Sequence, residues 1–262
     1  MNRPAASGNR FSKRVAVGLS LLSLHAAAAG AAVLYENPTV RVLRNRYSPN
    51  LRSPMHEHAS GRFVYVISGG SLRVQVEERK TEAPGKPPKV ETRQIDIALE
   101  GGRAAWRLPE RHALENVGSS TIEVLEVEVK EADEKACLPE DAKDLGPPEE
   151  GGGAEGRFLF RNRWGAVVGH LVRPGGTLAC PLAGHERFFY WLTSSEFASP
   201  REDRTERKVP RATGAFDWFL PGREPRGVNE GPETVEAVEV ILEKSLPKRR
   251  MVITGAGGDG GQ

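Results

Sequence analysis

Three histidines in the first half of the chain have the residue type and spacing to do chemistry. His56 and His58 lie two residues apart in a stretch with strand character, so their imidazole rings project from the same face. His112 follows in a second stretch of this kind. Imidazole nitrogens are common ligands of divalent metals, and a site with three protein ligands keeps a position open for water or substrate. We therefore predict that His56 and His58 can reach one metal ion, and we note His112 as a further candidate ligand.

The segments around these histidines have the pattern of strands. Residues 63–67 read Phe-Val-Tyr-Val-Ile before a Ser-Gly-Gly turn, residues 71–77 alternate apolar and polar side chains, and residues 122–129 mix apolar and acidic ones. The chain has 29 Gly and 19 Pro among its 262 residues, which interrupts it too often for a helical bundle. These features predict an all-β fold built as a barrel or a sandwich.

One pattern occurs twice in the chain. At an offset of 125, residues 33–69 align with residues 158–194 without a gap, and the motif Arg-Phe-x-Tyr at residues 62–65 recurs at residues 187–190. At offsets of 112 and 113, residues 106–111 align with 218–223 and residues 116–123 with 229–236. Internal repetition of this kind indicates a duplicated structural unit. We predict two domains of one architecture, at residues 32–131 and 156–244.

The other segments are expected to lie outside the repeated unit. The change of offset from 125 to 112 places 13 additional residues in the first copy, and we expect them in a solvated loop at residues 77–93, which contains Pro-Gly-Lys-Pro-Pro. Residues 132–155 are acidic and rich in Pro and Gly, which predicts a linker. The tail at residues 245–262 is predicted to be disordered.

The spacing of these residues resembles the two motifs of the cupin family. The first cupin motif contains H-x-H ahead of a strand that ends in glycine, and residues 56–58 together with residues 65–69 fit it. The second motif ends in H-x-x-x-N, and residues 112–116 fit it. A match of both motifs in order, inside a duplicated β unit, is much more specific than H-x-H alone.

The resemblance covers both copies, so the chain is similar to a bicupin. It implies an all-β fold of two tandem cupin-type barrels, which are jelly rolls of the double-stranded β-helix type. It also implies a divalent metal ion on His56, His58 and His112. Tyr65 and Asn116 belong to the matched motifs and are expected next to the site, where they would support the metal ligands or a substrate.

The sequence departs from the cupin pattern at Arg62. Cupins carry a glutamate ligand seven residues before the turn glycine, Gly69, and this chain has Arg62 there. A guanidinium about 6 Å from a divalent ion would cost roughly 5 kcal/mol at an effective dielectric constant of about 20. Arg62 is therefore expected to turn away, to pair with an acid such as Glu57 or Glu115, or to meet an anionic substrate. Because Arg187 stands at the equivalent place in the second copy, we favour a structural or acid-pairing role.

The second copy lacks the histidine pattern. Pro181 and Ala183 replace the H-x-H pair, and Glu224 falls where the third histidine would be. His170 and His185 have no partner at ligand spacing and are expected to be ordinary residues. The second copy is thus predicted to be a degenerate, metal-free cupin that packs against the first and stabilises it.

The first 31 residues have the pattern of a signal peptide. A basic region without acidic residues precedes an apolar run at residues 15–29, and small residues that suit cleavage follow. The run is shorter than the ~20 apolar residues that span a bilayer. We expect cleavage, export to the periplasm or the exterior, and no stable membrane insertion. In an oxidising compartment, Cys137 and Cys180 can pair or can remain two separate thiols.

The charge of the chain argues against nucleic acid as a partner. The whole chain has 37 Lys and Arg against 35 Asp and Glu, a net charge of +2. Residues 1–29 contain four basic and no acidic residues, so the mature chain has 33 against 35, a net charge of −2. A surface that neutralises a phosphate backbone needs an excess of Lys and Arg, and this composition does not provide one.

Two classes of function fit these features. In the first, the exported protein binds iron, manganese, zinc, nickel or copper on its three histidines and acts as a metal-dependent dioxygenase or other oxidoreductase on a small anionic substrate. Three neutral ligands leave the charge of the ion uncompensated, which favours such a substrate. In the alternative, the protein is a non-catalytic cupin that binds a small molecule or serves a structural or assembly role. Packing of the two barrels as a pseudo-dimer is compatible with both, and so is a homo-oligomer of whole chains.

Overall fold

The computed structural model describes residues 31–80, 88–130, 132, 155–178, 180, 184–200, 206–223 and 225–243. Within these residues the chain forms strands joined by turns and loops, without a helix, so none crosses a membrane as a helix, and the all-β prediction is confirmed. The strands of the first half are β1 (Ala31–Glu36), β2 (Val40–Tyr47), β3 (His56–His58), β4 (Arg62–Ser68), β5 (Gly70–Lys80), β6 (Lys89–Leu99), β7 (Ala104–Arg107), β8 (Glu110–Asn116) and β9 (Ile122–Val129). Those of the second half are β10 (Glu155–Asn162), β11 (Gly165–Val172), β12 (Thr177–Leu178), β13 (Glu186–Trp191), β14 (Ser195–Pro200), β15 (Glu206–Arg211), β16 (Phe216–Phe219), β17 (Gly227–Val228) and β18 (Val235–Leu242).

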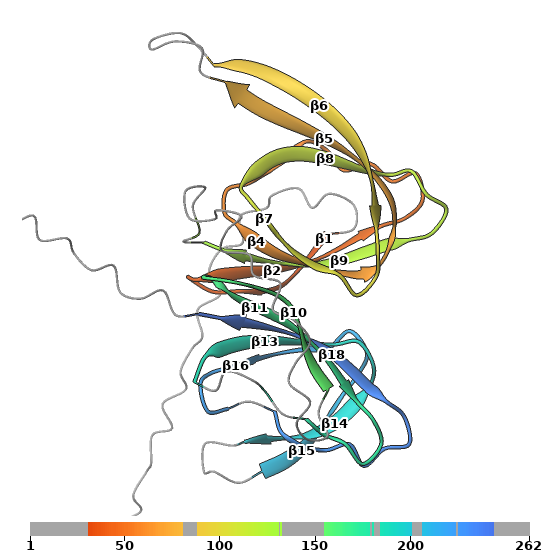
Figure 1. The fold of residues 1–262 in the computed structure, drawn as a ribbon, viewed down its shortest axis with the longest axis vertical. Helices are drawn as coiled ribbons and strands as arrows, with labels where there is room; N and C mark the ends of the chain where they lie inside the picture. Colours follow the sequence, from red (N-terminus) through yellow and green to blue (C-terminus); the bar gives the residue numbers. More distant parts are fainter. Residues whose placement is uncertain are drawn as a thin grey trace, which may run out of the picture.

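The first half of the chain forms a barrel from two antiparallel sheets (Figure 1). One sheet has the strand order β1-β2-β9-β4-β7, and the other has the order β3-β8-β5-β6. Because side chains alternate between the two faces of a strand, every second residue of β9 points into the barrel. Ile122 and Val124 pack there with Leu72 of β5, whereas Leu125 and Val127 are buried in a different cluster on the other face of β9.

The second half repeats the first of these sheets in the same chain order. Its five-stranded sheet has the order β10-β11-β18-β13-β16, and the short sheets β12-β17 and β14-β15 accompany it. Aromatic side chains fill the interior of this second barrel: Phe189, Trp191, Phe197 and Phe219 are at most 5% exposed and pack with Leu178. The chain is therefore two tandem barrels, one of which has an interior that is closed by aromatic rings.

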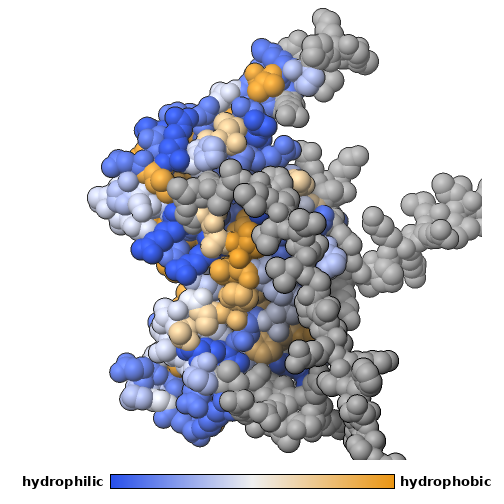
Figure 2. All heavy atoms as spheres, turned by 180° about the vertical axis from the view of Figure 1, so that it is seen from behind, coloured by the Kyte–Doolittle hydropathy of each residue, from blue (hydrophilic) through white to orange (hydrophobic). Residues whose placement is uncertain are grey.

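The two five-stranded sheets pack face to face and share one buried core. Val42 and Phe63 of the first barrel belong to the same cluster as Phe188 of the second. At one edge, Tyr35 of β1 stacks on Trp218 of β16 with ring centroids 4.8 Å apart. Figure 2 shows apolar atoms gathered where the two barrels meet, with polar surface above and below. The arrangement is that of a pseudo-dimer within one chain.

The prediction of a solvated loop at residues 77–93 is wrong at both ends of that range. β5 runs to residue 80 and β6 begins at residue 89, and the two strands remain paired throughout. This hairpin projects from the first barrel without a third strand beside its tip (Figure 1). Side chains of opposite charge meet diagonally across it: Lys80 lies 2.5 Å from Glu91, and Arg93 lies 3.5 Å from Glu78. Cross-strand charge pairs let a polar strand form without an apolar face, which is why the polar composition suggested a loop.

Several predicted segments lie outside the described residues. They include residues 1–30, most of the predicted linker with Cys137, and the tail after residue 243. The described strands span residues 31–129 in the first barrel and 155–242 in the second. The signal peptide, the linker, the domain limits and the pairing of Cys137 with Cys180 stay predictions.

Candidate metal centre

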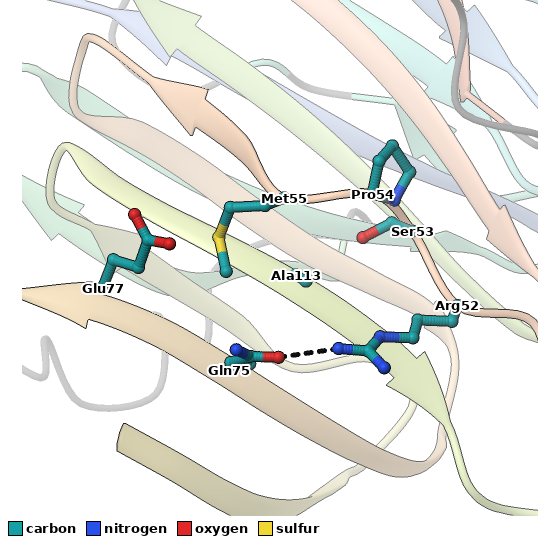
Figure 3. A pocket seen from close by; sticks show the side chains of 7 residues that line it. All are labelled: Arg52, Ser53, Pro54, Met55, Gln75, Glu77 and Ala113. Atoms are coloured by element: carbon teal, nitrogen blue, oxygen red, sulfur yellow. Dashed lines mark hydrogen bonds between the residues drawn. The ribbon is translucent and has the colours of Figure 1, made fainter. Parts of the chain in front are cut away.

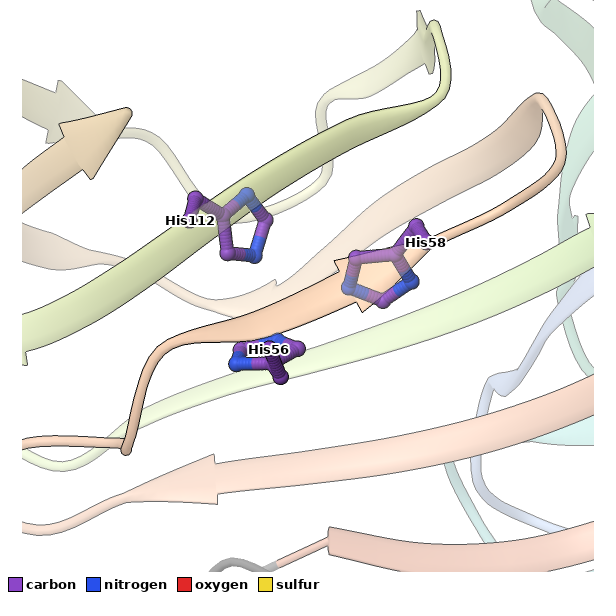
Figure 4. Close-up of side chains that lie close together, drawn as sticks. All are labelled: His56, His58 and His112. Atoms are coloured by element: carbon purple, nitrogen blue, oxygen red, sulfur yellow. The ribbon is translucent and has the colours of Figure 1, made fainter. Parts of the chain in front are cut away.

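Strands β3 and β8 bring the three histidines together inside the first barrel (Figure 4). The two strands pair antiparallel with His56 opposite His112, while His58 follows two residues along β3 on the same face. The ring centroids of the three imidazoles are 4.6 to 5.0 Å apart. One nitrogen of each ring can be chosen so that the three atoms lie within 4.8 Å of one another, which makes this a cluster that could hold a metal ion.

Oxygen atoms behind two of the rings fix their orientation. The Nδ1 atom of His56 lies 2.9 Å from the carbonyl oxygen of Pro54. The Nδ1 atom of His58 lies 2.6 Å from Oε1 of Glu128. An imidazole that donates through Nδ1 presents the lone pair of Nε2 on its other side, which is the arrangement of most histidines that ligate a metal.

The third ring lies in close contact with Glu110, but the angle is not that of a hydrogen bond. The Nδ1 atom of His112 lies 3.0 Å from Oε1 of Glu110. His58 and His112 are 5% and 3% exposed, and within the described structure the Nε2 atom of each is buried without a hydrogen-bond partner. A buried polar atom without a partner costs roughly 1–3 kcal/mol, so these two nitrogen atoms indicate a missing ligand. His56 is only half-buried and leaves one side of the cluster accessible to solvent.

Arg62 is an acid-pairing residue, but its partners differ from the acids named from the sequence. The guanidinium is 2% exposed, and its Nη2 atom donates to Oε1 of Glu110 at 2.6 Å. Its Nε atom lies 3.0 Å from Oε2 of Glu126, and its Nη1 atom donates to the carbonyl oxygen of Leu108 at 3.1 Å. Glu57 and Glu115 occupy alternate positions on β3 and β8 relative to the histidines, so strand alternation directs them away from the barrel interior.

The three acids of this network were not predicted from the sequence. Glu110 lies on β8 at the same parity as His112, and Glu126 and Glu128 lie on β9 at the parity of the inward-facing Val124. Glu126 is 4% exposed, which is rare for a carboxylate without a cationic partner. The detectable signal was an acidic residue at an inward position of a predicted strand, combined with an arginine at another.

Burial and the neighbouring cations act in opposite directions on the two acids that contact histidines. Burial raises the pKa of Glu110, but the close contact with His112 and the charges of Arg62 and His112 outweigh it and lower the pKa to about 2. Burial likewise raises the pKa of Glu128, but the hydrogen bond to His58 and the charges of His58, Arg41 and Arg62 together lower it. Burial also lowers the pKa of His56, against the hydrogen bond to Pro54, which favours the neutral imidazole that a metal ion needs.

The network carries the charge that a divalent ion would balance. With neutral imidazoles, Arg62 contributes +1 and the carboxylates of Glu110, Glu126 and Glu128 contribute −3, a sum of −2. Arg41 reaches Glu128 only at 4.0 Å and is itself 37% exposed. From the sequence we expected three neutral ligands to leave the charge of the ion uncompensated. In the structure, carboxylates that lie behind the histidines, rather than among the ligands, supply the compensating charge.

Two residues expected beside the site lie elsewhere. Tyr65 alternates with Arg62 on β4 and so points out of the barrel into the core between the two five-stranded sheets, where the charge of Glu236 from the second barrel acts on it. Asn116 lies at the far end of β8, where its amide donates to the carbonyl oxygens of Tyr47 and Ser120. Both contribute to the architecture and neither contacts the histidine cluster.

The second barrel keeps the acid-pairing arginine in a network of three buried side chains. The Nη1 atom of Arg187 donates to Glu239 at 2.5 Å, and the other oxygen of Glu239 lies 2.7 Å from Nε2 of His170. All three side chains are at most 1% exposed. His170, expected to be an ordinary residue, is thus a buried partner of Glu239. The positions of Pro181, Ala183 and Glu224 lie outside the described residues, so the absence of a metal site from this barrel stays a prediction.

An open cleft lies on the outer face of the sheet that carries the histidines. It has a volume of about 630 Å³, and Figure 3 shows Met55 and Ala113 beside a hydrogen bond of 2.7 Å from Arg52 to Gln75. Ala113 alternates with His112 on β8, so the cleft and the histidine cluster lie on opposite faces of the strand. The cleft therefore gives no access to the cluster through the sheet.

Comparison with known proteins identifies the fold. The sequence matches no protein-family model and no curated protein. A structure of the oxalate decarboxylase of Bacillus subtilis, described by its Mn(II) centres, is similar with a TM-score of 0.57 at 13% identity, over 81% of this chain and 72% of that one. The oxalate decarboxylase of Lactobacillus farciminis, in its formate complex, is similar with a TM-score of 0.55 at 12% identity, over 78% and 77%. The chain thus has the predicted fold of two tandem cupin-type barrels.

Proposed function

We propose that the first barrel binds one divalent metal ion through His56, His58 and His112 and uses it in an oxidoreductase reaction on a small anionic substrate. The observation that carries the proposal is the pair of buried Nε2 atoms of His58 and His112, which lack a hydrogen-bond partner in the described structure. Three imidazole nitrogens suit manganese, iron, nickel, copper and zinc. The oxalate decarboxylase of Bacillus subtilis, which shares the fold, has Mn(II) centres, so manganese is the first ion to test.

The surrounding residues fit such an ion. Pro54, Glu128 and Glu110 accept from or contact the Nδ1 atoms and so hold the rings with Nε2 toward the centre. A bound manganese or iron ion would supply Lewis acidity and one-electron redox chemistry. Arg62 pairs with Glu110 and Glu126, and its charge helps to lower the pKa of Glu110, so it acts on the site through Glu110.

The charge of the network also bears on the substrate. A divalent ion brings the sum of −2 to zero, so a singly charged anion would be buried at lower cost than a doubly charged one. The substrate would enter from the side of His56, which is only half-buried. We therefore propose a small monoanion, such as a monocarboxylate or an enolate, as the substrate class.

Metal analysis of the purified protein tests the metal site. We expect about one equivalent of metal in the wild-type chain after incubation with Mn(II) and desalting, and loss of it in His58→Ala and in His112→Ala. His185→Ala, which removes a histidine of the second barrel, is the control and should keep its metal. Equal metal content in wild type and in the two site variants would contradict the proposal.

Turnover is tested separately on the metal-loaded protein. Oxygen uptake and carbon dioxide release are measured with a panel of small monocarboxylates, enolates and oxalate. We expect metal-dependent activity that is lost in His112→Ala. If the fully metal-loaded protein showed no activity on any of these compounds, the oxidoreductase function would be contradicted, but the metal-binding site would not.

The proposal includes export of the mature chain. It rests on the basic region and apolar run of residues 1–31. N-terminal sequencing of the protein from its native compartment should give a start near residue 30, and a start at Met1 in the cytoplasm would contradict it.

A further inference from the structure

A small apolar cleft opens in the first barrel between the end of β6 and the edge strand β7. It has a volume of about 180 Å³. Its walls are mainly aliphatic, with Val64, Val66, Leu99 and Ala105 among them. Its rim carries one acid, Glu100, and two bases, Arg103 and Arg107. Val64 and Val66 follow Arg62 at every second position of β4, so all three side chains lie on the inward face of that strand, and so does the cleft.

The second barrel has the same strands but fills this space. By the internal repeat, Val64 and Val66 correspond to Phe189 and Trp191 at an offset of 125. The strand pairing agrees, because Val64 faces Ala105 across the ladder as Phe189 faces Asp217. Phe189 and Trp191 are fully buried and stack with ring centroids 5.6 Å apart. Small side chains in the first barrel therefore leave open the volume that aromatic rings occupy in the second.

A further exchange at the rim introduces a cation. Arg107 corresponds to Phe219 of the second barrel at an offset of 112, and each faces the acid-pairing arginine of its own barrel across the ladder. Two arginines directly opposite each other repel, and only Arg62 is compensated, by Glu110 and Glu126. Arg107 is exposed and forms no ion pair with a described residue, whereas Arg103 is paired with Glu100 at 2.9 Å.

We propose that this cleft binds a small aromatic monoanion, with its ring between Val64, Val66 and Ala105 and its carboxylate on Arg107. An apolar cavity of about 150 Å³ is known to hold one benzene ring, so the volume suits a single ring. The aromatic filling of the second barrel shows that the same strands accept rings in this place. The uncompensated guanidinium selects an anion over a neutral ligand. Binding in the cleft does not depend on the metal site.

Titration of the metal-free wild-type protein with benzoate tests the proposal. We expect saturable binding by calorimetry or by saturation-transfer NMR, at least tenfold weaker binding of benzyl alcohol, which lacks the charge, and no binding of acetate, which lacks the ring. Val64→Phe, which introduces the residue of the second barrel, should weaken benzoate at least tenfold. Arg107→Gln should reduce benzoate to the level of benzyl alcohol and leave benzyl alcohol unchanged.

Two controls keep the outcome decisive. Arg93→Gln removes a charge from the projecting hairpin and should leave benzoate binding unchanged. Ala105→Leu narrows the cleft from the opposite strand and replaces Val64→Phe if that variant does not fold. Benzoate binding that survives both cleft-filling changes, that requires added metal, or that is absent from the wild type would overturn the proposal. Because the titration uses metal-free protein, its failure is separate from a failure of the metal site.

Discussion

The two barrels contain the same arginine–glutamate pair in different surroundings. In the second barrel, Glu239 is shared between Arg187 and His170, all three side chains are buried, and the Nδ1 atom of His170 has no hydrogen-bond partner in the described structure. In the first barrel, Arg62 contacts Glu126 at 3.0 Å, and the network continues through further acids to histidines with Nε2 atoms that remain without a partner. We call the second network closed because it holds a single histidine, and the first network open because it ends in a cluster of three.

This difference changes the meaning of the arginine at the cupin glutamate position. Arg62 and Arg187 occupy equivalent places, and both pair with an acid on the adjacent strand, Glu126 or Glu239, which are equivalent at an offset of 113. The pair therefore belongs to the shared architecture of the barrels. The candidate site of the first barrel is built on that pair by the added histidines and their supporting acids.

The closed network predicts the largest effect on stability. Glu239→Ala leaves Arg187 buried without its acid, and removing one partner of a buried ion pair costs about 3–5 kcal/mol. We expect the free energy of unfolding, measured by urea titration, to fall by this amount. Glu243→Ala removes an acid of the same barrel that pairs with Arg161 at 2.9 Å near the surface, and should cost less than about 1 kcal/mol. Equal costs for the two variants would show that the Arg187 network is not a structural element of the second barrel.

A turn that recurs in the two halves of the chain predicts equal effects on the stability of both barrels. The amide of Asn116 donates to the carbonyl oxygens of Tyr47 and Ser120, and the amide of Asn229 donates to those of Val172 and Glu233, all at 2.8 Å. Asn116→Ala and Asn229→Ala should each lower the free energy of unfolding by about 1–3 kcal/mol, because buried carbonyls lose their donor.

Metal content provides the second measurement for this pair. Asn116→Ala should keep full metal occupancy, since its amide lies away from the cluster. If Asn116→Ala lost metal while its free energy of unfolding equalled that of Asn229→Ala, Asn116 would contribute to the metal site after all.

The open network predicts effects on metal affinity rather than on folding. Glu128→Gln and Glu110→Gln keep the size of each side chain but weaken the acceptor behind His58 and His112. Loss of such a support lowers metal affinity about 10- to 100-fold, or roughly 1.4–2.7 kcal/mol. Competition with a chromophoric chelator measures the dissociation constant, and Glu115→Gln, on the outer face of β8, is the matched control. Unchanged affinity in both variants would show that the acids do not support the ligands.

Much of the fold followed from the sequence because its signals are local or repeated. Alternation within strands and the duplication at offsets of 125 and 112 are both visible in one sequence, and they lead to the two-barrel architecture. The H-x-H pair and His112 were likewise visible as residues of one type at a regular spacing. The projecting hairpin was missed because cross-strand pairs such as Lys80 with Glu91 stabilise a polar strand only after pairing.

The surroundings of the histidines depend on which strands pair and in what register, and the separation of residues along the sequence does not give this information. Tyr65 follows Arg62 by three residues, and this odd separation puts the two side chains on opposite faces of β4. Glu110 and Glu126 come from strands that meet Arg62 only in the folded sheet. An inward acid and an inward arginine can be noted separately in a sequence, but their pairing depends on which strands are neighbours.

Acid should weaken the first barrel through three groups around its histidines. Glu110, with its pKa lowered to about 2 in the folded chain, stabilises the fold fully above its ordinary value of 4.5, and this contribution is lost as the pH falls toward about 2. Glu128 acts in the same direction. The lowered pKa of His56 means that the unfolded chain binds a proton more readily, so stability also declines as the pH falls below its ordinary value of 6.5.

The expected result for metal-free protein is a urea midpoint that falls in two steps, one beginning near pH 6.5 and one below pH 4.5. Glu110→Gln should flatten the second step and leave the first, and amide exchange should show β3 and β8 losing protection before β18. Because all three groups belong to the first barrel, the acid step distinguishes the open network from the closed one. A pH profile of Glu110→Gln that superimposes on that of the wild type below pH 4.5 would place the acid sensitivity outside the histidine network.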